Sequence, residues 1–523
     1  MIAARARGGV RTHHEIRAGT YLFLFFAFLV ILFAGHFSYL KLPYFWDELG
    51  QFVPAALDIL HENAWIPHST VPNVHPPGVM AYLAGIWRVF GYSIAATRSA
   101  MLLLATFGLL FTFLLAMRLS EGLAGIPALF AVLLLLCDPL FYTQAMMAQL
   151  DMPAMVFCLM ALVLFFEDRH RACALACTAA VLSKETSVLL PLVFTLVLFR
   201  ERRLKEYALV YAIPFATLCV WLLALWGVTG TPFGNRGFEH YNVAYSLNPI
   251  RVVFAFLRRI YYLFFDNFRW VGTVVIVLSW RRFHIYSSRA WRVTMLFAAA
   301  HIVLVSLLGG AELERYLLPV LPIFYIAVAA GLSTVPQWIR NVGLFAICGG
   351  LITGLFVNSV FPFPFEDNLA MADFVGLQQA AAQYLESNQK DKTIYTAWPL
   401  TAALRRSEYG YVQHPLKTKE TTDLRYSTLA KLDPNTVEVL VLYSRTWVPK
   451  WSVLQVSMVD RFLSKFYEYE PQMTAEQCKS MLGLVPVNRW TQRGQFIEVF
   501  VKPSVAQDQV TGAVTQDSPT GGN

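Results

Sequence analysis

The sequence has few charged residues. Asp, Glu, Lys and Arg together make up 15% of its 523 residues, whereas a soluble domain carries roughly 25%. Hydrophobic residues make up 56% and aromatic residues 15%. This shortage of charge excludes an ordinary soluble enzyme and a disordered chain, and it predicts that lipid rather than water surrounds much of the molecule.

The sequence also lacks the cysteine spacing of disulfide-linked or zinc-binding proteins, and it lacks nucleotide-binding motifs. Six of the seven cysteines lie in apolar runs, and Cys478 alone lies in the polar C-terminal part. This spacing excludes a disulfide framework and a CxxC zinc site. The sequence has no P-loop, no Rossmann glycine pattern and no zinc-ligand spacing, so neither a nucleotide-sugar donor nor a nucleic-acid partner is expected, despite the net charge of +8.

Long apolar runs are what the sequence contains instead. Residues 21–40 form a 20-residue stretch without a formal charge, which as a helix can cross about 30 Å of hydrocarbon. The run leads into Lys41 and Pro43 rather than into a small-residue cleavage site, so we expect an uncleaved first helix. Ten further spans are predicted at about 97–118, 122–141, 151–167, 171–185, 187–200, 206–228, 268–281, 291–309, 313–332 and 341–360.

The distribution of Lys and Arg predicts the orientation of these eleven spans. With the N-terminus in the cytoplasm, sixteen Lys and Arg fall on the cytoplasmic side and ten on the outer side before residue 364. Positive charge resists translocation, so the excess marks the inner face. We therefore expect a multi-pass membrane protein whose C-terminal part lies outside.

The C-terminal part has the composition of a soluble domain. Strand-like runs at 393–396, 437–442 and 495–501 alternate with helical patterns around 370–389 and 453–466. The sequence thus predicts an all-α membrane module over residues 1–364, a small extracytoplasmic α/β domain over 365–503 and a disordered tail over 504–523.

The large outer segment 41–96 holds the first candidate site residues. Asp47 and Glu48 follow the first span directly, and carboxylates near a membrane surface are costly to desolvate, which favours a function. Alone, they could equally be hydrated loop residues or helix caps. The apolar piece 78–90 is too short for a span and is predicted to be an interfacial helix.

Further polar residues are predicted at the same membrane face. Asp151 begins the fourth span, where it could be a simple helix cap. Lys184 lies at the end of the fifth span, and Arg258, Arg259 and Arg315 flank later ones, where they could be ordinary interfacial side chains. Together these groups offer cations for phosphate oxygens and a carboxylate for a hydroxyl, as a lipid-linked phosphate site requires.

Four short stretches, taken in order, resemble a known superfamily. They are Trp46-Asp47-Glu48, the His75-Pro76-Pro77-Gly78 segment with Tyr82, Gln149-Leu150-Asp151, and the pair formed by Leu182–Glu185 and Glu314–Pro319. The ordered set resembles the GT-C superfamily of polyprenyl-phosphate-sugar glycosyltransferases, in particular bacterial relatives of protein O-mannosyltransferases and the lipid A aminoarabinose transferase. At His75 the sequence departs from the Glu-Lys pair of the aminoarabinose transferases.

The resemblance implies roles for the matching residues. It implies that Asp47 is the general base, with Glu48 beside it, and that Asp151 is a second acidic residue of the catalytic cavity. It also implies a place in the bacterial inner membrane. It implies that Lys184 and Arg315 bind the donor phosphate. Arg258 and Arg259 are further candidates for phosphate binding because of their charge at the same membrane face. The remaining candidates are substrate-binding residues: Trp46, His75 and Tyr82.

The expected reaction moves a sugar from a polyprenyl-phosphate donor to an acceptor hydroxyl with inversion, on a glycan, lipid or protein acceptor. The departing phosphate needs no proton, so the enzyme has to activate the hydroxyl and stabilise the phosphate charge. No cofactor is required, although Asp47 and Glu48 could hold a divalent cation. The alternatives are a transporter or flippase of lipid-linked glycans, a glycan polymerase or ligase that attaches a preassembled oligosaccharide, or a noncatalytic membrane scaffold.

Overall fold

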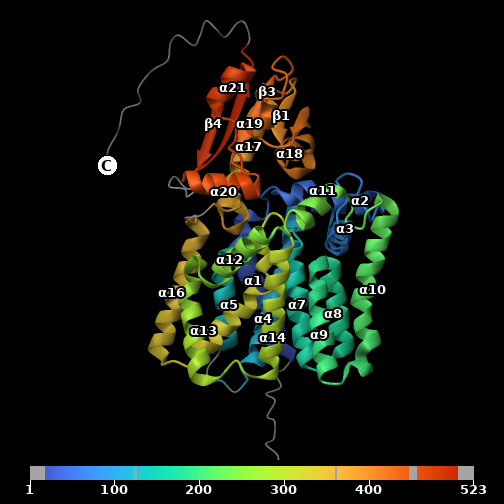
Figure 1. Cartoon of the computed structure of the whole chain (residues 1–523), viewed down its shortest axis with the longest axis vertical. Coiled ribbons are helices and arrows are strands. Elements are labelled where there is room, and N and C mark those ends of the chain that lie inside the picture. Colours follow the sequence, from blue (N-terminus) through green and yellow to red (C-terminus); the bar gives the residue numbers. More distant parts are fainter. Residues whose placement is uncertain (1–17, 122, 124–126, 360–361, 447–455, 504–523) are drawn as a thin grey trace, which may run out of the picture.

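The computed structural model describes residues 18–121, 123, 127–359, 362–446 and 456–503. The predicted tail 504–523 and the first residues of the predicted helix 453–466 lie outside these residues. The described chain forms a helical bundle with a small sheet at one end (Figure 1).

Each of the eleven predicted spans overlaps a helix. The helices are α1 (Ala18–His36), α4 (Ile94–Leu119), α5 (Pro127–Cys137), α7 (Asp151–Phe166), α8 (His170–Ser183), α9 (Leu189–Arg200), α10 (Leu204–Thr229), α13 (Arg269–Phe283), α14 (Arg289–Leu307), α15 (Leu321–Leu332) and α16 (Gln337–Phe356). Helices α7 and α15 are almost wholly buried, whereas α1 and α10 expose large apolar side chains such as Phe23 and Leu209. Apolar surface on the outside of a bundle fits lipid.

Only some of these helices have the length and composition that a membrane crossing needs. Among the described residues, α1, α4, α10, α14 and α16 are each long and apolar enough to cross a membrane. A sixth crossing results if α12 (Pro249–Phe264) and the segment from Asp266 are one span bent by 46°. The bend falls where Asn267 and Phe268 adopt left-handed backbone angles, which interrupts the helix. The chain is thus a mostly helical protein with five or six candidate spans, and the number eleven stays a prediction.

Short elements gather at the end of the bundle that carries the sheet (Figure 1). They include α2 (Val53–Glu62), α3 (Gly78–Phe90) and α11 (Arg236–Glu239). Helix α3 corresponds to the helix predicted for residues 78–90. Single turns break the long helices at this end: η2 (Glu48–Phe52), η3 (Glu185–Val188), η6 (Glu314–Leu317) and η7 (Phe365–Asp367).

The C-terminal region, residues 362–446 and 456–503, contains a five-stranded sheet in the order β2-β1-β3-β5-β4. The strands are β1 (Ile394–Ala397), β2 (Thr418–Thr421), β3 (Val439–Tyr443), β4 (Val485–Gln492) and β5 (Gln495–Val501). Strand β1 is parallel to both β2 and β3, whereas β5 is antiparallel to β3 and β4. The helices of this region are α17 (Ala370–Asn388), α18 (Leu400–Arg405), α19 (Tyr426–Leu429), α20 (Ser457–Tyr467) and α21 (Ala475–Leu482).

Specific contacts hold this region against the first outer segment. The Tyr411 hydroxyl donates a 2.7 Å hydrogen bond to the Tyr44 carbonyl, and the rings of Phe45 and Phe374 meet edge to face. One hydrophobic cluster runs from the bundle into the sheet. The sheet is therefore packed onto the segment that carries Asp47.

Candidate functional site

A cavity of about 820 Å³ lies where the bundle, its short end elements and the C-terminal region meet. Its charged lining residues come from segments far apart in the sequence: Asp47, Asp151, Lys184, Glu185, Arg258, Arg315, Glu366 and Arg445. Aromatic side chains, among them Trp46, Tyr241 and Trp398, form much of the remaining wall. Apolar walls with a few convergent polar groups are typical of a small-molecule site.

Asp47 reaches the cavity through an unusual backbone turn. Trp46 has a φ of 48°, in the left-handed region that is uncommon for a bulky residue. The next turn, η2, is a π-helix that begins at Glu48. Such strained turns and π-turns cluster at functional sites. This turn directs the Asp47 carboxylate into the cavity and the neighbouring Glu48 carboxylate away from it.

Arg315 is the cation on which the cavity carboxylates converge. Its guanidinium contacts the Asp47 carboxylate, and its Nε lies 3.2 Å from Glu366 Oε1 and 3.7 Å from Asp151 Oδ2. Nη1 also donates a hydrogen bond to Gln149 Oε1, and the Gln149 amide donates to Glu366 at 3.1 Å. The side chain of Arg315 is only 4% exposed. A buried cation with several acidic partners is held in one orientation.

Lys184 forms the second charged pair of the cavity. It ends α8 in an extended conformation, and its ammonium lies 2.5 Å from Asp151 Oδ1 at the first residue of α7. The ammonium also lies 4.1 Å from the centre of the Tyr316 ring, a cation–π distance. Asp151 therefore bridges Lys184 and Arg315 and joins the two cations into one network.

His75 also lines the cavity. Its Nδ1 lies 2.8 Å from Glu185 Oε2, and the Phe238 ring meets the imidazole edge to face. This contact joins the outer segment to the turn after α8, beside Lys184. His75 therefore connects the outer segment to the part of the cavity wall that carries Lys184.

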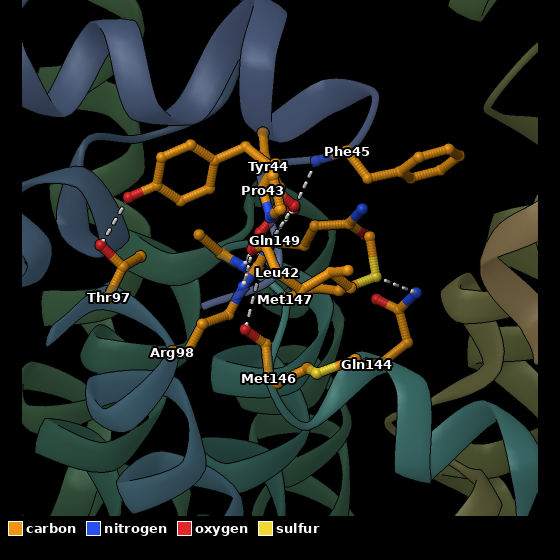
Figure 2. Close-up of polar contacts among 12 residues, drawn as sticks. Leu42, Pro43, Tyr44, Phe45, Thr97, Arg98, Gln144, Met146, Met147 and Gln149 are labelled. Atoms are coloured by element: carbon orange, nitrogen blue, oxygen red, sulfur yellow. Dashed lines mark hydrogen bonds and ion pairs between the residues drawn. The ribbon is translucent and has the colours of Figure 1, made fainter. Parts of the chain in front are cut away.

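Glu48 is placed in a different environment from Asp47. Its carboxylate is fully buried and accepts hydrogen bonds from the Arg98 guanidinium and from the backbone N–H groups of Phe45 and Ala148. Arg98 also donates to the carbonyls of Pro43 and Met146, as Figure 2 shows. Glu48 does not line the cavity, so the structure makes it a support for the turn that carries Asp47.

Two other predicted residues also lie outside the cavity wall. Arg259 donates hydrogen bonds to the carbonyls of Glu312 and Leu313, which fixes the loop that leads to Arg315. The Tyr82 hydroxyl donates to the Ala100 carbonyl and ties α3 to α4. Arg258 does line the cavity, with Glu312 at 3.8 Å. Trp46, Asp47, His75, Asp151, Lys184 and Arg315 also line it.

Several cavity residues had no signal in the sequence. Glu366 follows the last apolar helix and was expected only to mark the start of a soluble domain. Trp398 and Arg445 belong to the C-terminal region, in which the sequence shows no recognisable motif. Gln149, in contrast, belongs to one of the sequence motifs, and although it does not line the cavity, its carboxamide joins Arg315 to Glu366, which do.

Both acidic residues of η7, Glu366 and Asp367, are buried, and Glu366 lines the cavity. Burial raises the pKa of Glu366, an effect that Arg315 opposes and Asp47 reinforces. Burial and the nearby Glu314 and Glu366 raise the pKa of Asp367 well above its usual value. Neither carboxylate oxygen of Asp367 has a hydrogen-bond partner among the described residues.

Asp47 and Glu48 are the residues that the sequence offers for a divalent cation. Because the Glu48 carboxylate is surrounded by Arg98 and backbone amides, the two carboxylates do not share a coordination position. Within the described ranges, Asp58, Glu62 and His68 form the group of three whose ligand atoms lie within 4.8 Å of one another. They lie on and after α2 and do not line the cavity.

Comparison with known proteins identifies the fold. The crystal structure of ArnT from Cupriavidus metallidurans bound to undecaprenyl phosphate has a TM-score of 0.54 and 16% identity, over 92% of this chain and 98% of that one. The apo form of the same protein gives a TM-score of 0.53 at 16% identity, with the same coverage of both chains. No protein-family model matches the sequence. No curated protein matches it either.

A second solved structure is similar over a smaller part of its own length. The Archaeoglobus fulgidus oligosaccharyltransferase in complex with Zn and sulfate has a TM-score of 0.49 and 11% identity, over 80% of this chain and 67% of that one. The score of this second structure is lower, so the fold is identified from the likeness to ArnT. The chain thus has the fold of ArnT, and the resemblance predicted from the sequence is confirmed at the level of the fold.

Proposed function

We propose that the protein is a membrane glycosyltransferase that transfers a sugar from a polyprenyl-phosphate donor to an acceptor hydroxyl. The observation that carries this proposal is the position of the Asp47 carboxylate. It lies in a cavity of about 820 Å³, beside Asp151 and the cations Lys184 and Arg315. The ArnT fold, solved with undecaprenyl phosphate, supports a lipid phosphate as the leaving group.

The proposed reaction is a single displacement. Asp47 takes the proton of the acceptor hydroxyl as its oxygen attacks the anomeric carbon. The bond from that carbon to the phosphate oxygen breaks, and the electron pair leaves with the polyprenyl phosphate. Attack opposite the leaving group inverts the anomeric configuration, and general-base help of this kind contributes roughly 10²–10⁴-fold to the rate.

The cavity cations act on the departing phosphate. Lys184 and Arg315 are held by Asp151 and Asp47, so their charges are oriented before the donor binds. Oriented charges in a site with little water stabilise developing charge more than mobile ions do. We assign the cavity to the outer face of the bacterial inner membrane, with the N-terminus in the cytoplasm, because the predicted Lys and Arg excess lies on the opposite side.

The test uses the purified full-length chain in lipid nanodiscs with a panel of radiolabelled undecaprenyl-phosphate sugars. Membrane lipids, lipopolysaccharide and peptide fractions serve as acceptors. We expect label to move from one donor to one acceptor class, with release of undecaprenyl phosphate. A wild-type protein that moves lipid-linked sugar between leaflets of a vesicle without transferring it to an acceptor would be a flippase, and the proposal would be rejected.

A further inference from the structure

The C-terminal region presents the carboxyl ends of its parallel strands to the cavity. Trp398 follows β1 and Arg445 lies two residues beyond the end of β3, and both line the cavity. Strands β1 and β3 are parallel neighbours, so these residues share one edge of the sheet. Ligands of sheets with parallel strands bind preferentially at this edge. The edge of the sheet where ligands usually bind therefore faces the cavity.

Hydrogen bonds fix both residues at this edge. The Tyr443 hydroxyl, at the end of β3, donates a 2.8 Å hydrogen bond to the Trp398 carbonyl. Ser444 exchanges two hydrogen bonds with Phe496, through its backbone N–H and its hydroxyl oxygen. The backbone that leads into Arg445 is therefore held by strand pairing.

Arg445 differs from the other cavity cations in its partners. Lys184 pairs with Asp151, Arg315 with Asp47, and Arg258 with Glu312. Arg445 forms no ion pair with a carboxylate among the residues that the structure describes. A cation without an acidic partner in a cavity attracts an anionic ligand more strongly than one whose charge is neutralised.

The surroundings of Arg445 place this charge next to the reacting centre. Its guanidinium lies 5.6 Å from the centre of the Trp46 ring, and Trp46 precedes Asp47. The Trp46 and Trp398 rings meet edge to face at 5.5 Å. A guanidinium stacked on an aromatic face keeps its outer N–H groups free to bind oxygen in a fork.

We propose that Arg445, supplied by the C-terminal region, binds a phosphate group of the substrate. This inference rests on the proposed function and extends it, because it makes the C-terminal region a part of the binding site. Two sources would supply the same chemistry: the phosphate of the polyprenyl carrier and a phosphate of the acceptor. Trp46 and Trp398 frame the position where that phosphate meets the guanidinium.

The experiment compares Arg445→Ala and Arg445→Lys with the wild type, each as the full-length chain in nanodiscs. Binding of radiolabelled undecaprenyl phosphate is measured directly, and the KM for the acceptor fraction is measured separately. A lost charged hydrogen bond corresponds to about a tenfold or larger loss of affinity. Lys431→Ala is the matched control, because Lys431 is an exposed cation of the same region that does not line the cavity.

We expect Arg445→Ala to weaken undecaprenyl phosphate binding about tenfold, Arg445→Lys to retain part of it and Lys431→Ala to match the wild type. Unchanged carrier binding with a raised acceptor KM would also support the proposal and identify the acceptor as the source. Unchanged values for both would overturn it. A wild type that binds the carrier without transferring sugar would instead reject the proposed function and leave the assignment of Arg445 standing.

Discussion

Arg315 contacts the carboxylate of Asp47 across a sequence separation of 268 residues. One residue follows the first apolar helix and the other precedes α15, so folding of nearly the whole bundle is needed to bring them together. The same guanidinium lies near Asp151 and Glu366. The proposed base and the proposed phosphate site therefore form one network rather than two separate sites.

Replacement of Glu48 is expected to affect stability first. Glu48→Gln removes the charge that pairs with the buried Arg98 guanidinium, and loss of one partner of a buried ion pair costs about 3–5 kcal/mol. We predict a markedly lower melting temperature in detergent and a lower yield of folded protein. Glu62→Gln is the control, since its side chain is 60% exposed and its loss should change stability little. A fully stable Glu48→Gln protein would contradict the supporting role.

Replacement of Lys184 is expected to act on donor use. Lys184→Ala leaves the cavity with one cation fewer near Asp151, and we predict a fall of about 10–100-fold in kcat/KM for the donor. Steady-state kinetics with varied donor and saturating acceptor would measure it. The control is Lys205→Ala, an exposed cation at the start of α10. Donor kinetics unchanged from the wild type would remove Lys184 from the phosphate site.

Gly50 tests the contact between the C-terminal region and the Asp47 turn. A Cβ atom at Gly50 would lie 2.0 Å from Nε1 of Trp398, so Gly50→Ala has to displace the indole. Overpacking of this kind costs typically 1–3 kcal/mol, and we predict a lower melting temperature and reduced transfer.

Two further variants isolate the cause of the Gly50 effect. In a Trp398→Ala background the methyl group that Gly50→Ala introduces meets no indole. Gly50→Ala should then lower the melting temperature and the transfer rate little further. Gly85→Ala is the matched control, because its Cβ would have no neighbour within 4 Å. If the losses at Gly50 and Trp398 were simply additive, the two residues would not be coupled.

Asp367 is expected to make stability depend on pH. Burial raises its pKa, so the folded protein keeps a proton that the unfolded chain has already lost. Folding stability contributed by this proton is present at low pH and is lost as the pH rises toward the raised pKa. Asp367→Asn carries no such proton. We predict that the variant melts above the wild type at pH 8 and that the difference shrinks as the pH is lowered toward about 4, the ordinary pKa of an Asp carboxyl. A difference in melting temperature that stayed the same between pH 8 and about pH 4 would contradict this assignment.

The helical module could be predicted from the sequence because its signal is local. Apolar runs specify helices wherever lipid or other helices cover them, and most helix ends lie within a few residues of the predicted ones. The span predicted at 313–332 is an exception, because η6 precedes α15, which begins only at Leu321. Residues 127–144 form two helices rather than one, because Asp138 caps a new short helix, α6 (Pro139–Gln144), after α5. Apolar runs alone do not specify which helices cross the membrane, since α8 and α9 are short.

The sheet could be predicted only in part. Strands β1, β3 and β5 are apolar runs and were predicted. Strands β2 and β4 were not, because β2 is short and polar and β4 contains Pro486. Both lie at the edges of the sheet, where one side has no neighbouring strand and polar residues are tolerated.

The residues of the cavity could be predicted from the sequence only in part. Motifs indicated Asp47, Asp151, Lys184 and Arg315, and the structure brings all four together. The opposite directions of Asp47 and Glu48 follow from the backbone at Trp46, which no pattern of neighbouring residues encodes. Likewise, Glu366 and Arg445 reach the cavity only through tertiary packing of the C-terminal region.

The most direct test of the account is transfer by Asp47→Asn. The variant keeps the size of the side chain and a hydrogen-bonding oxygen for Arg315, so we expect it to fold and to bind undecaprenyl phosphate like the wild type. Asp391→Asn, at an exposed position of the C-terminal region, is the control. Transfer of labelled sugar from undecaprenyl phosphate should fall by at least about a hundredfold in Asp47→Asn alone. Transfer at the wild-type rate by a folded Asp47→Asn protein would contradict the assignment of Asp47 as the base.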